Sequence, residues 1–250
     1  MALDAVDESQ RKAAKVAGFA FLLAMVIVVI ANYGISFRLI VPGNAADTAR
    51  NIMAHELLFR LNIVCDLVYV ATIVVLLAAL YVILTPVDRN LALAAAFFRL
   101  AFAALWGFAA LNMLGALRLL GDAPYLPVFE ATQLQTLARL HLVAGFDAYY
   151  VGLPFWGLAS TVCGYLWFKS RYVPRALAAF GVISSAWCVI CAFAYLVSPG
   201  FANVVGLSWF DVPMVMFEMA IGFWLLFKGL GPSGMAGPDN ASDWARVAAA

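Results

Sequence analysis

The sequence predicts an all-α polytopic membrane protein, a bundle of six transmembrane helices with short interfacial helices in the external loops. Composition is the first observation behind this prediction. Of the 250 residues, 66% are hydrophobic and 12% are charged, and the mean hydropathy is +0.95, far above that of soluble domains. The second observation is that the apolar residues form six runs, each long enough to cross a hydrocarbon core of about 30 Å.

Short polar connectors separate these runs, and the prolines Pro86 and Pro174 stop helices in two of them. An even number of spans places both chain ends on the same side of the membrane. The predicted spans, in order, are Ala14–Phe37, Leu58–Leu84, Leu91–Leu119, His141–Phe168, Ala176–Ser198 and Pro213–Leu230.

The chain therefore divides into an N-terminal segment (1–13), a six-helix transmembrane domain (14–230) and a mobile tail (231–250). Basic residues mark the side of the chain ends, which the positive-inside rule assigns to the cytoplasm. These residues are Arg11, Lys12, Lys15, Arg89, Lys169, Arg171, Arg175 and Lys228. We therefore expect a multi-pass membrane protein with both chain ends in the cytoplasm.

The connectors on the opposite side are longer than the cytoplasmic turns. Helical spacing of apolar residues predicts an interfacial amphipathic helix in residues 44–57 and a segment of similar character in residues 130–140. The third connector, residues 200–212, carries Trp209 and Phe210, which suit the headgroup boundary.

Three acids lie inside predicted spans, where charges are costly and are therefore candidate functional groups. Asp66, Asp147 and Glu218 each follow one long connector and lie about 8–12 Å below the outer end of their helix. We expect them to supply negative charge to an outer-facing polar pocket. The other candidates for this pocket are cationic or polar neighbours: Arg60, His141, Asn62, Asn112 and Tyr150.

Arg99 is a separate candidate on the inner side. It lies eight residues into its predicted span, and its expected behaviour is to snorkel to cytoplasmic headgroups. Alternatively it pairs with free carbonyls or lines an inner cavity, with Trp106 on the same helix face. By helix rise, Arg99 and Asp66 are expected to lie too far apart for contact.

Several classes of function lack support in the sequence. It has no phosphate-binding loop, dinucleotide-binding turn or serine nucleophile elbow, so no cofactor is expected. A net charge of +1 excludes a nucleic-acid footprint. A metal site is still possible, since two carboxylates with His141 would suffice as ligands. The cysteines Cys188 and Cys191 are expected to pack as small buried residues.

Three functions remain. The first is non-enzymatic binding of a small molecule, lipid or ion in the outer pocket, with transport as one version; because six helices are few for a carrier, transport would require a homodimer. The second is a structural or accessory subunit of a membrane complex, whose aromatic faces meet partner helices or lipid: Trp156, Trp167, Trp187 and Trp224. The third is a membrane-embedded hydrolase or transferase.

The chain also resembles a known family through five segments in a fixed order: residues 11–18, 39–49, 58–61, 91–100 and 173–177. These segments, which include the Leu-Phe-Arg ending at Arg60 and the Phe-Phe-Arg ending at Arg99, are similar to the bacterial integral membrane proteins grouped as domain of unknown function 4386. The resemblance runs from about Arg11 to Gly229. It implies a bacterial inner-membrane protein with several helices, and it implies no activity.

Overall fold

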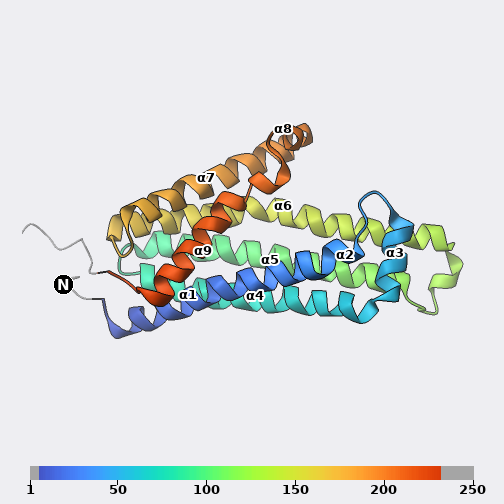
Figure 1. The fold of residues 1–250 in the computed structure, drawn as a ribbon, viewed down its shortest axis with the longest axis horizontal. Helices are drawn as coiled ribbons and strands as arrows, with labels where there is room; N and C mark the ends of the chain where they lie inside the picture. The colour runs from blue at the N-terminus through green and yellow to red at the C-terminus, as the bar shows by residue number, and fades with distance from the viewer. Residues whose placement is uncertain (1–5, 232–250) are drawn as a thin grey trace, which may run out of the picture.

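The computed structural model describes residues 6–231, and this part of the chain is almost entirely helical, with no strand (Figure 1). Six of its helices are long and apolar enough to cross a membrane, as predicted. The α-helices are α1 (Glu8–Val29), α2 (Phe37–Leu39), α3 (Ala45–Ala54), α4 (Glu56–Leu84), α5 (Arg89–Leu120), α6 (Ala131–Ser170), α7 (Arg175–Val197), α8 (Ala202–Val205) and α9 (Val212–Phe227). A π-helix (Ile30–Ser36) joins α1 to α2, and 3₁₀ turns cover Leu126–Val128, Pro199–Phe201 and Leu207–Trp209.

The six long helices form a closed ring. Each of α1, α4, α5, α6, α7 and α9 contacts the next in chain order, and α9 returns to contact α1. Figure 1 shows α9 crossing over the bundle to reach α1. The ring has an interior toward which every spanning helix presents one face, so polar groups on those faces can meet there.

Glycines permit the contact between α1 and α9 that closes the ring. A Cβ atom on Gly18 would lie 2.6 Å from the backbone nitrogen of Leu226 and 2.8 Å from the carbonyl oxygen of Gly222. Such distances are shorter than van der Waals contact, so the two backbones approach this closely only because neither glycine has a side chain.

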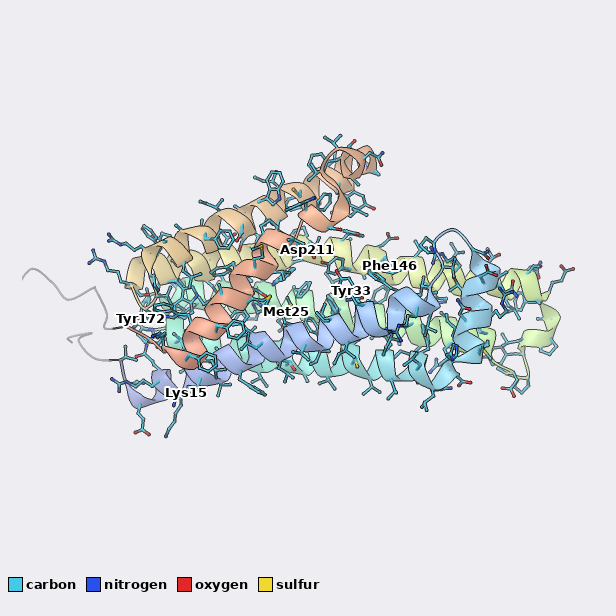
Figure 2. All side chains as sticks on the ribbon, in the orientation of Figure 1. Lys15, Met25, Tyr33, Phe146, Tyr172 and Asp211 are labelled. Atoms are coloured by element: carbon cyan, nitrogen blue, oxygen red, sulfur yellow. The ribbon has the colours of Figure 1, made fainter. Side chains whose placement is uncertain are left out.

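The bundle has two distinct ends. We call the one that holds the start of α1 and the end of α9 the terminal end, and the opposite one the α3 end (Figure 1). Figure 2 labels Lys15 and Tyr172 at the terminal end. There the buried Gln10 side chain donates to the carbonyl of Ile83 (3.1 Å) and to the Tyr172 hydroxyl (3.3 Å), which ties α1 to α4 and to the α6–α7 turn.

Two apolar clusters fill the interior. The larger one lies within the ring and includes residues of all six long helices. The smaller one lies at the α3 end, where Ile52 of α3 packs with Phe59 of α4, Leu117 of α5 and Leu142 of α6. The smaller cluster explains how α3 stays on the bundle although it is only 10 residues long.

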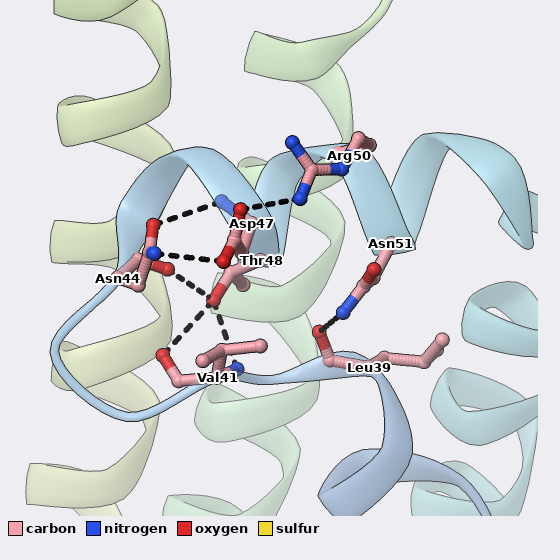
Figure 3. Close-up of polar contacts among 7 residues, drawn as sticks. All are labelled: Leu39, Val41, Asn44, Asp47, Thr48, Arg50 and Asn51. Carbon is pink, nitrogen blue, oxygen red and sulfur yellow. Dashed lines mark hydrogen bonds and ion pairs between the residues drawn. The ribbon is translucent and has the colours of Figure 1, made fainter.

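Local hydrogen bonds fix the loop before α3 (Figure 3). Asn44 caps the helix by accepting from the backbone nitrogen of Asp47 at 2.9 Å. The Thr48 hydroxyl donates to the carbonyls of Asn44 (2.7 Å) and Val41 (3.2 Å), and it accepts from the backbone nitrogen of Val41 (3.0 Å). The helix expected in residues 44–57 is therefore present.

Two helices begin earlier in the chain than the predicted spans. Residues 130–140 form no separate interfacial helix but the first turns of α6, because a capping box at Glu130 starts the helix and no breaker follows before His141. The helix α1 begins at Glu8, inside the predicted N-terminal segment, because Asp7 and Gln10 form a capping box. The predicted tail, residues 231–250, lies outside the described residues except for Gly231.

Phe210, expected at the headgroup boundary, points into the protein. Its side chain is buried, with its ring 5.8 Å from the ring of Tyr195 and 5.8 Å from that of Phe201. The neighbouring Trp209 is exposed. The short helical turns before α9 place Phe210 inward and Trp209 outward.

Candidate functional site

Four side chains meet in the interior of the ring, and we call them the Arg99–Glu218 cluster: Arg99 of α5, Trp156 and Ser160 of α6, and Glu218 of α9. Arg99 Nη2 lies 2.9 Å from Glu218 Oε1 and 2.8 Å from the Ser160 hydroxyl. Trp156 Nε1 donates to the same Glu218 oxygen at 2.8 Å, and Ser160 donates to it at 3.1 Å. Three donors from two helices therefore converge on one carboxylate oxygen.

Helix rise places the cluster well inside the candidate membrane spans. Arg99 is ten positions from Arg89, where α5 starts at the terminal end, and Ser160 is ten positions from Ser170, where α6 ends there. At about 1.5 Å per residue, both lie about 15 Å from the terminal end, half the thickness of a hydrocarbon core of about 30 Å. Glu218 agrees, because it lies near the middle of the shortest candidate span, Leu207–Phe227.

Burial makes the ion pair costly to break. The side chain of Arg99 is 2% exposed and that of Glu218 is 13% exposed. The ring of Phe21 of α1 lies 5.7 Å from the guanidinium carbon, which adds a cation–π contact from a fourth helix. A buried pair offsets its desolvation only when both partners remain, so loss of either charge destabilises the interior.

Arg99 keeps unused hydrogen-bonding capacity. Its Nε and Nη1 atoms are buried and donate to no group within residues 6–231. Arg99 also borders a narrow crevice between α4, α5 and α6, whose interior has room for about one water molecule. Orphaned donors beside an open space are where an anion or a water molecule binds.

Two further carboxylates, the buried Asp66 and the half-buried Asp211, accept hydrogen bonds from aromatic side chains. Trp106 Nε1 donates to Asp66 Oδ1 at 3.0 Å, and the Tyr149 hydroxyl donates to Asp211 Oδ2. Figure 2 shows Asp211 where α9 begins. The rings of Trp106 and Tyr149 lie 5.6 Å apart, so these two acids are joined through a pair of aromatic donors.

The aromatic contacts continue to the Arg99–Glu218 cluster. The ring of Phe102 stacks on Trp156 at 5.4 Å and meets Trp106 edge-on at 5.7 Å. Glu218, Asp66 and Asp211 each accept from a different aromatic residue of one connected group. The interior is thus built on α5 and α6, which carry all of these donors.

The outer candidates are dispersed. Asp147 is exposed on α6, about 35 Å from the terminal end by helix rise and so beyond a hydrocarbon core placed on α7 and α9. Arg60 pairs with Glu56 on the surface of α4 at 2.7 Å. His141 is exposed, and its Nδ1 lies 3.0 Å from Asn112 Oδ1. Asp147, Arg60 and His141 therefore do not surround one pocket.

Two of the remaining candidates have local partners. The buried amide of Asn62 donates to the hydroxyl of Ser36, the last residue of the π-helix, at 3.0 Å. Its Oδ1 atom is buried and accepts nothing within the described part of the chain. The ring of Tyr150 lies 4.9 Å from that of Tyr195, and Tyr150 is half-buried.

Two expectations about charged groups are corrected. Arg99 does not snorkel to headgroups, because a full ion pair inside the ring satisfies its charge. Glu218 lies with Arg99 rather than with Asp66 and Asp147, because α9 is 16 residues long and starts well below the α3 end. Arg99 makes no hydrogen bond or ion pair with Asp66 in the described residues, and it borders the narrow crevice between α4, α5 and α6.

Sequence reasoning missed Asp211, Tyr149, Ser160 and the inward role of Trp156. Asp211 was outside the predicted span, which began two residues later. Ser160 and Trp156 lie four positions apart on α6, and Tyr149 precedes Trp156 by seven, so all three share a helix face. That shared face was the available signal. Trp156 and Trp167 are buried, against the expectation that they meet lipid or partners.

Metal-binding groups do not gather in the structure. No three His, Cys, Asp or Glu side chains within residues 6–231 lie close enough together to hold a metal ion. Cys188 and Cys191 are fully buried in the larger apolar cluster, where they fill small spaces in α7.

Comparison with known proteins identifies the family. A curated relative, an uncharacterized protein of Archaeoglobus fulgidus, is 26% identical over 157 residues, which cover 60% of this chain and 73% of that protein. The expected bacterial origin stays a prediction, since this relative comes from an archaeon. No solved structure matches the chain. The sequence pattern described as "Domain of unknown function (DUF4386)" matches residues 16–229, and the chain belongs to this family.

Proposed function

We propose that this multi-pass membrane protein binds a small molecule or ion at the Arg99–Glu218 cluster, inside the membrane, and that it acts by binding or transport rather than by catalysis. One observation carries the proposal. A guanidinium that is 2% exposed keeps two unpaired donor nitrogens, in an arginine that also borders a narrow crevice. Burying unpaired polar atoms costs free energy, and a bound ligand recovers it.

The site differs from the outer pocket expected from the sequence. That pocket needed Asp66, Asp147 and Glu218 to converge, and Asp147 is exposed outside the ring. Of the three acids, Glu218 has an arginine partner in the interior and Asp66 has an aromatic donor. The proposed function is therefore still binding or transport, but the proposed site is at the inner candidate Arg99 instead of the outer pocket.

Native mass spectrometry of protein released from lipid nanodiscs tests the proposal. Wild type should carry a bound mass that is lost in Arg99→Gln and Glu218→Gln. The matched control is Arg60→Gln, which removes an arginine from an exposed ion pair and should leave the bound mass in place. A wild-type protein without any bound mass, or one bound equally by all variants, favours the accessory-subunit function instead.

The same measurement reports the oligomeric state. If the protein transports its ligand, we expect a homodimer, because six helices are few for an alternating-access carrier. Membrane lipids are the other expected partners. A monomer in every lipid composition would restrict the function to binding.

We also propose a bacterial cytoplasmic membrane as the location, with both chain ends in the cytoplasm. Support comes from the basic residues of the terminal end, which include Lys12, Lys15, Lys169 and Lys228, whereas no lysine lies at the α3 end. A single cysteine placed at Glu130 in a cysteine-free background tests this. A membrane-impermeant maleimide should label it from outside intact cells, and labelling only after lysis contradicts the orientation.

A further inference from the structure

The side chain of Asn62 in α4 uses its donor nitrogen fully and leaves its acceptor oxygen bare. The Nδ2 atom lies 3.0 Å from the hydroxyl of Ser36, the last residue of the π-helix, and 3.7 Å from the sulfur of Met113 in α5. A thioether sulfur accepts hydrogen bonds and cannot donate them, so these contacts fix the orientation of the amide. The Oδ1 atom is buried and accepts nothing within residues 6–231, in a residue that is 2% exposed.

Asp66, one helical turn further along α4, also keeps an oxygen without a donor. Its Oδ1 atom accepts from Trp106 Nε1 at 3.0 Å, and its Oδ2 atom receives no hydrogen bond from the described part of the chain. No arginine, lysine or histidine among residues 6–231 forms an ion pair with this carboxylate. Asp66 is 8% exposed, and a buried carboxylate without a cation is unfavourable. Its charge therefore requires a partner from outside the chain.

Helical spacing brings the two side chains together on one face of α4. Residues four positions apart on an α-helix are neighbours, with Cβ atoms about 5–6 Å apart. Helical side chains lean toward the N-terminus of their helix, which tips Asp66 toward Asn62. Both side chains contact α5, Asn62 at Met113 and Asp66 at Trp106. This spacing is one that pairs of metal ligands on a helix use, so one small ion between the two turns can meet an oxygen of each residue.

Charge and ligand type select the kind of ion. A carboxylate and a neutral amide together carry one negative charge, so a monovalent cation leaves the site neutral. A divalent cation would leave an uncompensated positive charge inside a membrane span, which is strongly unfavourable. Hard metal ions take oxygen ligands, neutral ones included, so such a site needs neither histidine nor cysteine. Because protein atoms enclose Asn62 Oδ1, the site excludes an organic ammonium ion and favours sodium over the larger potassium.

We propose that Asn62 Oδ1 and the free carboxylate oxygen of Asp66 bind a sodium ion, with water completing its coordination. Asp66 is ten positions from Glu56, where α4 starts, so by helix rise the site lies about 15 Å from the α3 end. Ser36 is a positioning residue, because it accepts from Nδ2 and so holds the amide with Oδ1 free. The π-helix that carries Ser36 is of a kind found frequently at functional sites. This site is separate from the Arg99–Glu218 cluster and does not rest on the proposed function.

Binding of radioactive sodium to the full-length protein in mild detergent, measured by scintillation proximity, tests the proposal. Wild type should bind one sodium ion per chain. Unlabelled sodium chloride should displace the label, potassium chloride should displace it only at much higher concentration, and choline chloride should leave it bound at equal ionic strength. Sodium should also raise the thermal unfolding midpoint above its value in choline chloride, because a ligand of the folded state stabilises that state.

Variants separate the ligands from the positioning residue. Asp66→Asn removes the charge and should abolish sodium binding. Asn62→Leu removes one oxygen from the ion and should weaken binding roughly tenfold or more. Ser36→Ala should weaken binding less than Asn62→Leu does, and Ser36→Thr, which keeps the hydroxyl, should bind as wild type does. The matched control is Glu56→Gln, which removes an exposed carboxylate from the first turn of the same helix and should leave sodium binding unchanged.

A change of ion preference gives a second, independent test. Asn62→Asp places two carboxylates at the site, so calcium should displace sodium from this variant at lower concentration than from wild type. A wild type that binds no sodium overturns the proposal, and so does sodium binding that survives in Asp66→Asn or that choline displaces equally well. If Asp66→Asn does not fold, the calcium titration decides, and an unchanged calcium preference in Asn62→Asp overturns the proposal.

Discussion

The indole Nε1 of Trp156 donates a 2.8 Å hydrogen bond to Glu218 Oε1, the same oxygen that lies 2.9 Å from Arg99 Nη2. This bond joins α6 to α9, and the ion pair joins α9 to α5. The carboxylate of Glu218 is therefore a common anchor for three helices of the ring. Disturbing any of these groups affects helix packing as well as ligand binding, and the predictions below separate the two effects.

Removing Arg99 should destabilise the protein strongly. In Arg99→Gln the charge of Glu218 stays buried without its cation, and breaking a buried pair this way costs about 3–5 kcal/mol. The double variant Arg99→Gln/Glu218→Gln should recover much of this loss, because two neutral amides can hydrogen-bond to each other. Unfolding in a denaturing detergent, followed by circular dichroism, measures the free energies for a double-mutant cycle.

The control for this cycle is Arg60→Gln. Arg60 pairs with Glu56 at the surface, where its side chain is 54% exposed, so its loss should cost less than about 1 kcal/mol. Equal costs for Arg99→Gln and Arg60→Gln would show that the interior pair is not desolvated.

Replacing Trp106 by Phe should destabilise the interior through Asp66. The indole supplies the hydrogen bond that Asp66 accepts from a side chain, and Asp66 is 8% exposed. An unsatisfied buried acceptor costs about 1–3 kcal/mol. Thermal unfolding in mild detergent should show this loss for Trp106→Phe and little change for Trp209→Phe, whose indole is 61% exposed. In an Asp66→Leu background the acceptor is absent, so Trp106→Phe should lower the thermal stability less than it does in wild type. An equal loss in both backgrounds would contradict the role of this hydrogen bond.

Gly18→Ala should loosen the closure of the ring. The added methyl group would lie 2.6 Å from backbone of α9, which cannot move aside as a side chain can, and overpacking of this kind costs about 1–3 kcal/mol. Gly107→Ala on α5 is the matched control, because a Cβ there meets no atom within 4 Å. The thermal midpoints should fall for Gly18→Ala and stay constant or rise for Gly107→Ala. The reverse order would contradict the described contact of α1 with α9.

Thr48→Val should release the loop that precedes α3. Valine has nearly the same shape as threonine but loses the three hydrogen bonds that the hydroxyl makes with Val41 and Asn44. Hydrogen exchange followed by mass spectrometry should show faster exchange in residues 40–54 and unchanged exchange in α9. Arg50→Gln, which removes an exposed ion pair of the same helix, should leave exchange in this segment near wild type. Unchanged protection in Thr48→Val would assign the stability of α3 to its apolar contacts alone.

Hydropathy was sufficient to predict an all-α bundle of six spans, because an apolar helix of this length has no alternative to the membrane. The closed ring was not predicted, because hydropathy does not say which helices are neighbours. Boundaries were harder. The segment 130–140 has the same amphipathic character as α3, and only the absence of a breaker before His141 continues it into α6.

The site was predictable only in its residue types. Arg99 and Glu218 stood out as charges inside apolar runs, but their pairing depends on which helices are neighbours in the ring and on the depth at which α9 starts. Neither is encoded in the periodicity of a single helix. Asp147 and Glu218 look alike in sequence. However, α6 is long, and Asp147 is exposed on the part of α6 that lies farther from the terminal end.

The length of α6 has a practical consequence. Its 40 residues measure about 60 Å, twice the thickness of a hydrocarbon core, and α6 is the least apolar of the six candidate spans. A detergent belt placed on α7 and α9 leaves the other half of α6 uncovered, braced by α3 and α5. That half is a rigid helical extension of a chain of only 27.0 kDa. An antibody fragment raised against it would give electron microscopy the rigid marker that a protein of this size otherwise lacks.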